Sequence, residues 1–177
     1  MKFVNSKIQG AFVIEIEKIL DDRGYFARLI EKKELQERGL IDEFIQFSIS
    51  HNLKKGTFRG MHFQLEPYSE VKMISCVKGK IFDIILDLRK NSPTFLQWES
   101  NELDADSHSL LYIPKGVAHG FQTLENNTEV FYQMSEEFRE DYYSGVRWND
   151  PSFDIKLPLS ISSISEKDSS FTEFKSN

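Results

Sequence analysis

Two stretches decide the fold: Arg59-Gly60-Met61-His62-Phe63-Gln64 and Pro114-Lys115-Gly116-Val117-Ala118-His119-Gly120. Each places polar side chains at strand positions where a β-barrel aims residues inward. The interior of a barrel excludes water and does not usually collect histidine, lysine and arginine unless they have a function. Strand alternation puts His62 and Gln64 on one face and Phe63 and Leu65 on the other.

Further short strands are predicted before, between and after these two stretches. The best candidate for a helix is Glu31 to Arg38, which Gly39 ends. The alternation of apolar and polar residues predicts strands at 12–16, 57–65, 71–77, 81–88, 110–113 and 128–134. Many short strands, separated by glycine and proline, indicate an all-β sandwich or barrel with few helices. The serine-rich tail after Pro158 has the composition of a disordered segment, but Ile161, Ile164 and Phe171 could dock it.

Composition limits the class of protein. The 177 residues suit a single domain, and 40% hydrophobic with 28% charged residues is typical of a soluble globular chain. A net charge of -6 argues against nucleic-acid binding. We expect no membrane span and no signal peptide. The single Cys76 excludes an internal disulfide and favours the cytoplasm.

The spacing Pro114-x-Gly116-x-x-His119 is that of the second cupin motif, a turn that delivers a histidine into a jelly-roll barrel. Metal-binding cupins pair this histidine with His-x-His on an earlier strand, where this chain has His62-x-Gln64. Two separated histidines and a glutamine make a poor transition-metal site, so we expect no metal. Considered alone, Tyr132 would be read as a core residue with its hydroxyl hydrogen-bonded. Lys72 lies on an apolar strand face, so its ammonium either extends outward to solvent or is held inside for electrostatics.

Taken together, the motifs resemble the dTDP-4-dehydrorhamnose 3,5-epimerase family from about Asp22 to Asp168. The resemblance rests on several motifs in order: Asp22-Arg23-Gly24-Tyr25-Phe26, Arg59 to Gln64, Lys72, Cys76-Val77-Lys78-Gly79, Phe82-Asp83, Asp87-Leu88-Arg89, Ser92-Pro93-Thr94-Phe95, Ile113 to Phe121, Tyr132, Arg147-Trp148-Asn149-Asp150-Pro151 and Ser165-x-x-Asp168. It implies a cupin-type double-stranded β-helix (jelly-roll) barrel over residues 1–177. It also implies N-terminal strands exchanged in a homodimer and a C-terminal tail that packs back near the site.

The resemblance implies epimerisation of a nucleotide-linked 4-dehydro-6-deoxyhexose, by default dTDP-4-dehydro-6-deoxy-D-glucose. His62 would be the general base, and Asp168 would orient its imidazole. Lys72 would face the developing enolate oxygen, and Tyr132 would return a proton from the opposite face of the ring. The ketone of the substrate is its own electron sink, so no cofactor is implied. Cell-envelope polysaccharide is the implied destination of the product.

The resemblance also implies a set of substrate-binding residues: Arg23, Phe26, Gln46, Ser48, Arg59, His119 and Phe138. Arg59 and Arg23 would bind the diphosphate, to which a guanidinium fork is well suited, and Arg23 and Phe26 would reach the partner subunit's site. Strict alternation puts Arg59 on the face opposite His62, which predicts a bulge at Gly60 or a diphosphate at the barrel rim.

Three positions depart from the family pattern: Arg28 replaces a glutamate, Ser48 an asparagine and Phe138 a tyrosine. These positions help to recognise the nucleotide base, so the identity of the base stays open. Also open are a single-centre epimerase, a sugar-nucleotide ketoisomerase, a non-catalytic cupin that binds a sugar nucleotide, and a metal-dependent cupin oxygenase or isomerase. His51 and His108, with turn-like neighbours, are read as surface residues.

Overall fold

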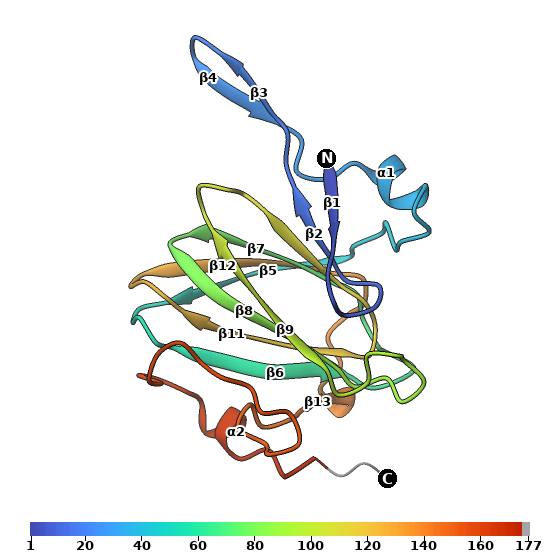
Figure 1. Cartoon of the computed structure of the whole chain (residues 1–177), viewed down its shortest axis with the longest axis vertical. Helices are drawn as coiled ribbons and strands as arrows, with labels where there is room; N and C mark the ends of the chain where they lie inside the picture. Colours follow the sequence, from blue (N-terminus) through green and yellow to red (C-terminus); the bar gives the residue numbers. More distant parts are fainter. Residues whose placement is uncertain (175–177) are drawn as a thin grey trace.

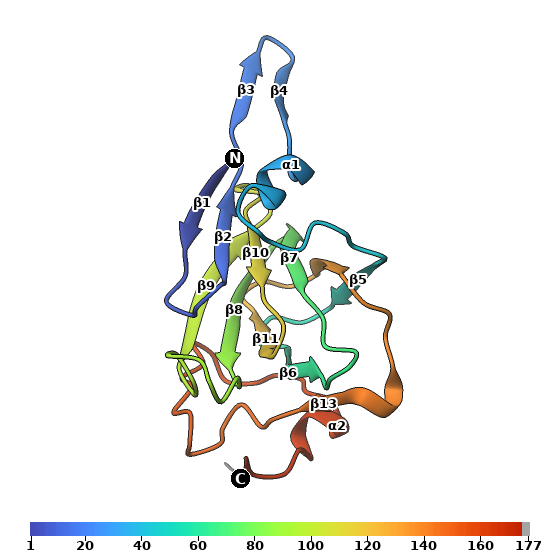
Figure 2. The same ribbon diagram turned by 90° about the vertical axis from the view of Figure 1, so that its right-hand side faces the viewer.

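The computed structural model describes residues 1–174 and consists mainly of two antiparallel sheets that face each other (Figures 1 and 2). The first sheet has six strands in the order β1-β2-β10-β7-β12-β5. Its strands are β1 (Lys2–Asn5), β2 (Phe12–Glu15), β5 (Gln46–Asn52), β7 (Lys72–Lys78), β10 (Leu110–Ile113) and β12 (Thr128–Met134). The second has five strands in the order β13-β6-β11-β8-β9. Its strands are β6 (Phe58–Gln64), β8 (Lys80–Asp87), β9 (Trp98–Asp104), β11 (Val117–Thr123) and β13 (Tyr143–Gly145).

The remaining regular elements lie outside the two sheets. The hairpin of β3 (Lys18–Asp21) and β4 (Gly24–Ala27) projects away from the barrel, as Figures 1 and 2 both show. The helices are short: α1 (Lys32–Gln36), the 3-10 turn η1 (Glu140–Tyr142) and α2 (Glu166–Ser169). Within residues 1–174, no helix has the length and apolar character needed to cross a membrane.

The turn between β7 and β8 carries the chain from one sheet to the other, as a jelly roll requires. β7 pairs with β10 and β12, whereas β8 pairs with β9 and β11. Gly79 makes this turn with a φ of +75°, a conformation that L side chains rarely adopt. A Cβ at this position would lie 2.7 Å from Thr128 Oγ1. Glycine is therefore required here for both conformational and steric reasons.

The main core lies between the two sheets. Alternation along β7 turns Ile74 and Cys76 inward, where they meet Ile81 and Ile85 of β8 and Phe121 of β11. Each of these five residues is at most 1% exposed. Full burial of one such aliphatic or aromatic side chain stabilises a fold by about 1.5–3 kcal/mol. This core fixes the strands from which the polar side chains of the barrel interior project.

Chain from the two ends of the sequence covers part of each outer sheet face. On the six-stranded sheet, Leu35 of α1 packs against Val71 and Met73. On the five-stranded sheet, the segment from Val146 onward covers an apolar face centred on Phe58. Figure 2 shows this C-terminal segment lying along β6 and β13.

The predicted fold class is confirmed. The predictions of strands at 110–113 and 128–134 match β10 and β12. The boundaries of the other predicted strands differ from the observed ones by at most one residue, and those of the helix by at most two. The prediction of a turn around His51 is wrong, because His51 lies within β5. Its side chain is exposed, as expected. The neighbouring Asn52 is polar for a reason other than a turn, because it is buried and its side-chain amide donates to the backbone oxygens of Ser50 and Thr128.

Candidate active site

The predicted polar residues meet in a pocket of about 260 Å³ between the two sheets. β5, β7 and β12 contribute from the six-stranded sheet, and β6 and β11 from the five-stranded sheet. The lining residues are Gln46, Ser48, Ile49, Ser50, Arg59, His62, Lys72, His119, Tyr132 and Met134.

His62 is paired with Asp168, which follows it by 106 residues in the chain. The imidazole Nε2 lies 2.8 Å from Asp168 Oδ1, and Asp168 Oδ2 accepts a hydrogen bond of 3.1 Å from the amide of Gly60. Burial lowers the pKa of His62, while Asp168 acts in the opposite direction. The pKa of Asp168 is itself lowered, because hydrogen bonds from His62, Gly60 and Ser165 outweigh its burial. A neutral imidazole held by an ionised carboxylate has the character of a general base.

Lys72 is held inside the barrel rather than extending to solvent. Its Nζ lies 3.1 Å from Glu70 Oε1 and donates to the backbone oxygen of His62 at 3.2 Å. The side chains of Lys72 and Glu70 are 10% and 9% exposed. An ammonium has three N–H donors, so these two contacts leave one for the pocket.

Tyr132 reaches the pocket from β12, on the sheet opposite the strand of His62. Burial raises the pKa of its phenol, and the charge of Asp83 raises it further. Tyr132 is therefore a neutral phenol that still carries its proton, which is the form that a general acid needs.

A second histidine–carboxylate pair lies beside the first. His119 on β11 is the register partner of His62 on β6. Its Nε2 lies 2.8 Å from Oδ2 of Asp83, which is completely buried. Burial raises the pKa of Asp83. This contact holds His119 Nε2 against Asp83, so the other ring nitrogen is the one available to a ligand.

The conflict between Arg59 and strand alternation is resolved by a bulge. In the β11–β6 ladder, His119 pairs with His62 and Phe121 pairs with Arg59, so three steps on β6 match two steps on β11. The extra residue brings Arg59 and His62 into the same pocket. Arg59 Nε donates to Asn52 Oδ1 at 2.8 Å, which orients the guanidinium and leaves its outer nitrogens for an anion.

Comparisons with known proteins identify the family of the chain. A model of the family described as dTDP-4-dehydrorhamnose 3,5-epimerase matches residues 5–176. The chain belongs to the dTDP-4-dehydrorhamnose 3,5-epimerase family. It is therefore an enzyme of the isomerase class, as the sequence predicted.

Members of the dTDP-4-dehydrorhamnose 3,5-epimerase family match this chain over nearly their whole length. The epimerase of Methanothermobacter thermautotrophicus is 36% identical over 179 residues, which cover 99% of this chain and 96% of the relative. The Bacillus anthracis epimerase, solved with TDP and PPi bound, has a TM-score of 0.93, 40% identity, and coverage of 98% and 99%. The Legionella pneumophila epimerase, solved with dTDP-4-keto-L-rhamnose, has a TM-score of 0.89, 30% identity, and coverage of 97% and 92%.

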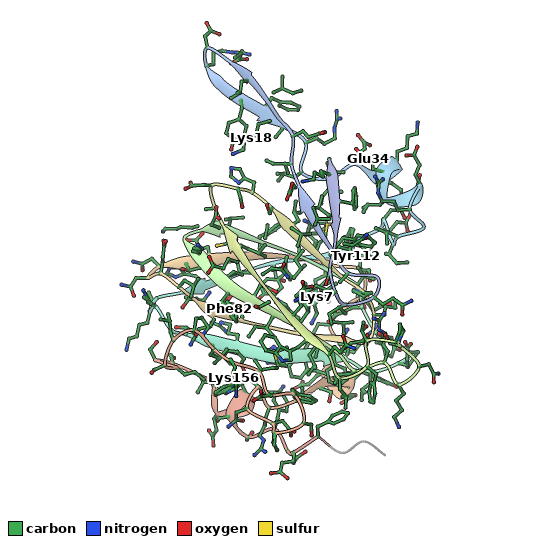
Figure 3. The ribbon with its side chains drawn as sticks, in the orientation of Figure 1. Lys7, Lys18, Glu34, Phe82, Tyr112 and Lys156 are labelled. Carbon is green, nitrogen blue, oxygen red and sulfur yellow. The ribbon has the colours of Figure 1, made fainter. Side chains whose placement is uncertain are left out.

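The other binding residues predicted from the epimerase family lie in two places. Phe138 is at the rim, 52% exposed, and its backbone N–H donates to Gln46 Oε1 at 2.9 Å. Arg23 and Phe26 lie on the β3–β4 hairpin, away from the pocket of their own chain. The Arg23 side chain is 85% exposed and pairs with Asp21. Figure 3 shows how far this hairpin, with Lys18, lies from Phe82 in the barrel.

The glutamine at the usual metal-ligand position has a structural role here. Gln64 donates to the backbone oxygens of Tyr68 and Glu137 and accepts from the backbone of Arg139. Among residues 1–174 no group of three or more histidine, cysteine or acidic side chains is arranged to hold a metal ion.

Several site residues were missed by the sequence analysis of this epimerase. Ser50 could have been found, since it alternates with Gln46 and Ser48 along β5. Asp83 belongs to the Phe82-Asp83 motif, which by itself indicates no role for the carboxylate. Tyr143, whose ring lies 5.2 Å from that of His62, gives no local signal, because β13 reaches the site only through its pairing with β6.

Proposed function

We propose that this epimerase inverts carbon centres of a dTDP-linked 4-dehydro-6-deoxyhexose, by default dTDP-4-dehydro-6-deoxy-D-glucose, through an enolate. The observation that carries the proposal is the meeting of His62 and Tyr132 from opposing sheets in one pocket, with Lys72 between the same two sheets. A base on one side and an acid on the other is the arrangement that inversion at a carbon requires. A protein that only bound the sugar nucleotide would not need it.

The proposed reaction starts with proton removal by His62 from a carbon next to the ketone. The electron pair moves into the carbonyl, and the oxygen takes a negative charge that the Lys72 ammonium stabilises. Asp168 stabilises the imidazolium that forms. Tyr132 then gives its proton to the other face of the same carbon, and the carbonyl re-forms. The ketone accepts and returns the electron pair, so no oxidant or reductant is needed. The protein is left with a His62 imidazolium and a Tyr132 phenolate, and for the next turnover His62 must lose a proton and Tyr132 regain one by exchange with solvent.

Proton NMR in deuterated water tests this function. The purified protein with dTDP-4-dehydro-6-deoxyglucose is expected to lose signal at the carbons flanking the ketone, whereas a His62→Ala control is not. Exchange at both carbons supports double epimerisation, and exchange at one indicates a single-centre enzyme. A product with a moved carbonyl would identify a ketoisomerase. No exchange at all would contradict the proposal and leave a binding role or another nucleotide.

We also propose a homodimer in which each hairpin completes the partner's site. A nucleotide sugar is larger than the 260 Å³ pocket, so part of it must bind elsewhere. The hairpin exposes Ile19, Leu20 and Phe26, and the edge strand β5 exposes Phe47 and Ile49. Apolar surface of this kind is typical of an interface. A second copy would bury it and could bring Arg23 to the diphosphate. The cytoplasm is proposed as the compartment, since Cys76 is a free thiol.

Replacing Ile19 with aspartate is expected to convert the dimer into monomers, because a charge would be buried in the apolar contact. Sedimentation velocity measures the change, and KM for the nucleotide sugar should rise with it. Leu53→Asp is the matched control, since Leu53 is as exposed as Ile19, at 68%, but lies outside the hairpin and β5. A dimer that survives Ile19→Asp, or a control that dissociates equally, would contradict this interface.

A further inference from the structure

The C-terminal strap, residues 159–174, is attached to the barrel at several points. The buried Gln122 side chain both donates to Leu159 O, at 2.9 Å, and accepts from Leu159 N, at 3.1 Å. Ser162 N donates to Gly56 O at 2.9 Å. At the far end, Phe174 N donates to Asp150 Oδ2 at 2.8 Å. The part of the strap between these attachments therefore has a defined position against β6 and β13.

Phe171 lies in this part and occupies a space that only glycine leaves open. Gly145 on β13 is the register partner of His62 on β6. A Cβ at position 145 would lie 2.3 and 2.4 Å from the Cζ and Cε2 atoms of Phe171. The Phe171 ring therefore rests directly on the backbone of Gly145, beside the base.

The Phe171 ring also packs against the imidazole of His62. The Phe171 and His62 ring centroids are 6.1 Å apart at 65°, so the rings meet edge to face. The Tyr143 ring also packs against the imidazole, with ring centroids 5.2 Å apart. Nζ of Lys167, in the strap, lies 3.9 Å from the centroid of the Tyr143 ring. Phe171 is not among the residues that line the substrate pocket. It covers part of the His62 side chain, which stays 24% exposed, without lining the pocket.

We propose that Phe171 is a positioning residue that excludes water from His62 and so keeps the base neutral and ready to accept a proton. This role rests on the proposed function, because it assigns proton removal to His62. The strap then supplies two opposing influences on one imidazole. Asp168 favours the protonated form, and Phe171 favours the neutral form by removing the water that would hydrate a cation.

The charged and titratable groups around His62 are consistent with this balance. Burial is the largest cause of the lowered His62 pKa. Asp168 on α2 raises it, whereas Lys72 on β7 and His119 on β11 lower it. Tyr143 on β13 stays neutral, because burial strongly raises its own pKa. Removing an apolar wall alone should therefore raise the pKa of His62.

The test is an NMR titration of the imidazole resonances in Phe171→Ala. The chain has only four histidines, so a His62→Gln spectrum assigns the His62 signal. The His62 titration is expected to move to higher pH, and the acidic limb of the kcat/KM profile should move with it. In Phe171→Leu the His62 titration should lie close to that of the wild-type protein, since leucine also excludes water. The plateau rate at high pH should change little.

Phe174→Ala is the matched control. Phe174 belongs to the same strap but packs against Phe153, with ring centroids 5.3 Å apart, and should leave the titration of His62 unchanged. An unchanged or downward shift in Phe171→Ala, or an equal shift in Phe174→Ala, would overturn the proposal. The titration needs no substrate, so it can fail or succeed independently of the epimerase activity.

Discussion

Replacing His62 with alanine is expected to lower kcat by ~10²–10⁴-fold, the usual contribution of a positioned base. Solvent exchange at the carbons next to the ketone should fall by the same factor, because proton removal comes before every later step. KM and the affinity for dTDP should change little, since Arg59, Gln46 and Ser48 are untouched. Stopped assays for product and NMR exchange measure the two losses side by side.

His51→Ala is the control for this variant, since His51 is exposed on β5 and is not in the pocket. It should keep nearly full activity. Thermal unfolding should show that His62→Ala remains folded. If His62→Ala retained more than about a tenth of the wild-type exchange rate, another group would have to be the base.

Replacing Tyr132 with phenylalanine is expected to separate exchange from inversion. The base and Lys72 remain, so the enolate still forms and solvent deuterium still enters. Without the phenol, no positioned acid delivers a proton to the opposite face, and inversion should fall by ~10²–10⁴-fold. The ratio of deuterium incorporation to epimer formed, followed by NMR in one sample, measures this separation.

Tyr142→Phe is the matched control. Tyr142 packs on Tyr68, with ring centroids 4.6 Å apart, and does not line the pocket. It should leave both rates close to wild type. An equal loss of exchange and inversion in Tyr132→Phe would argue that Tyr132 organises the pocket and does not donate the proton.

Much of the fold could be predicted because its strands are short, alternate regularly and end at glycine or proline. Alternation failed at Arg59, because a bulge at Gly60 changes which face a side chain occupies, and the sequence could only raise that possibility. The docking of the tail was also within reach. Ile161 and Ile164 pack on the apolar face of the five-stranded sheet, although the composition around them resembles disorder.

The candidate site was predictable only where a local motif marked it. His119 has such a motif, and His62 gains significance from its neighbours. Asp168 has no local signal and was named through family resemblance alone, because its partner is 106 residues away. Asp83 and Phe171 acquire roles only through contacts that the folded chain creates, and no periodicity encodes those contacts.

The strap has two duties. It covers an apolar sheet face, and it carries the carboxylate that holds the base. A chain cut or terminated before residue 159 would lose both at once. Damage at this end would then produce a destabilised protein that is open to degradation, rather than a durable, inactive enzyme that sequesters its substrate. Inactivation and clearance are thereby linked in a single stretch of sequence.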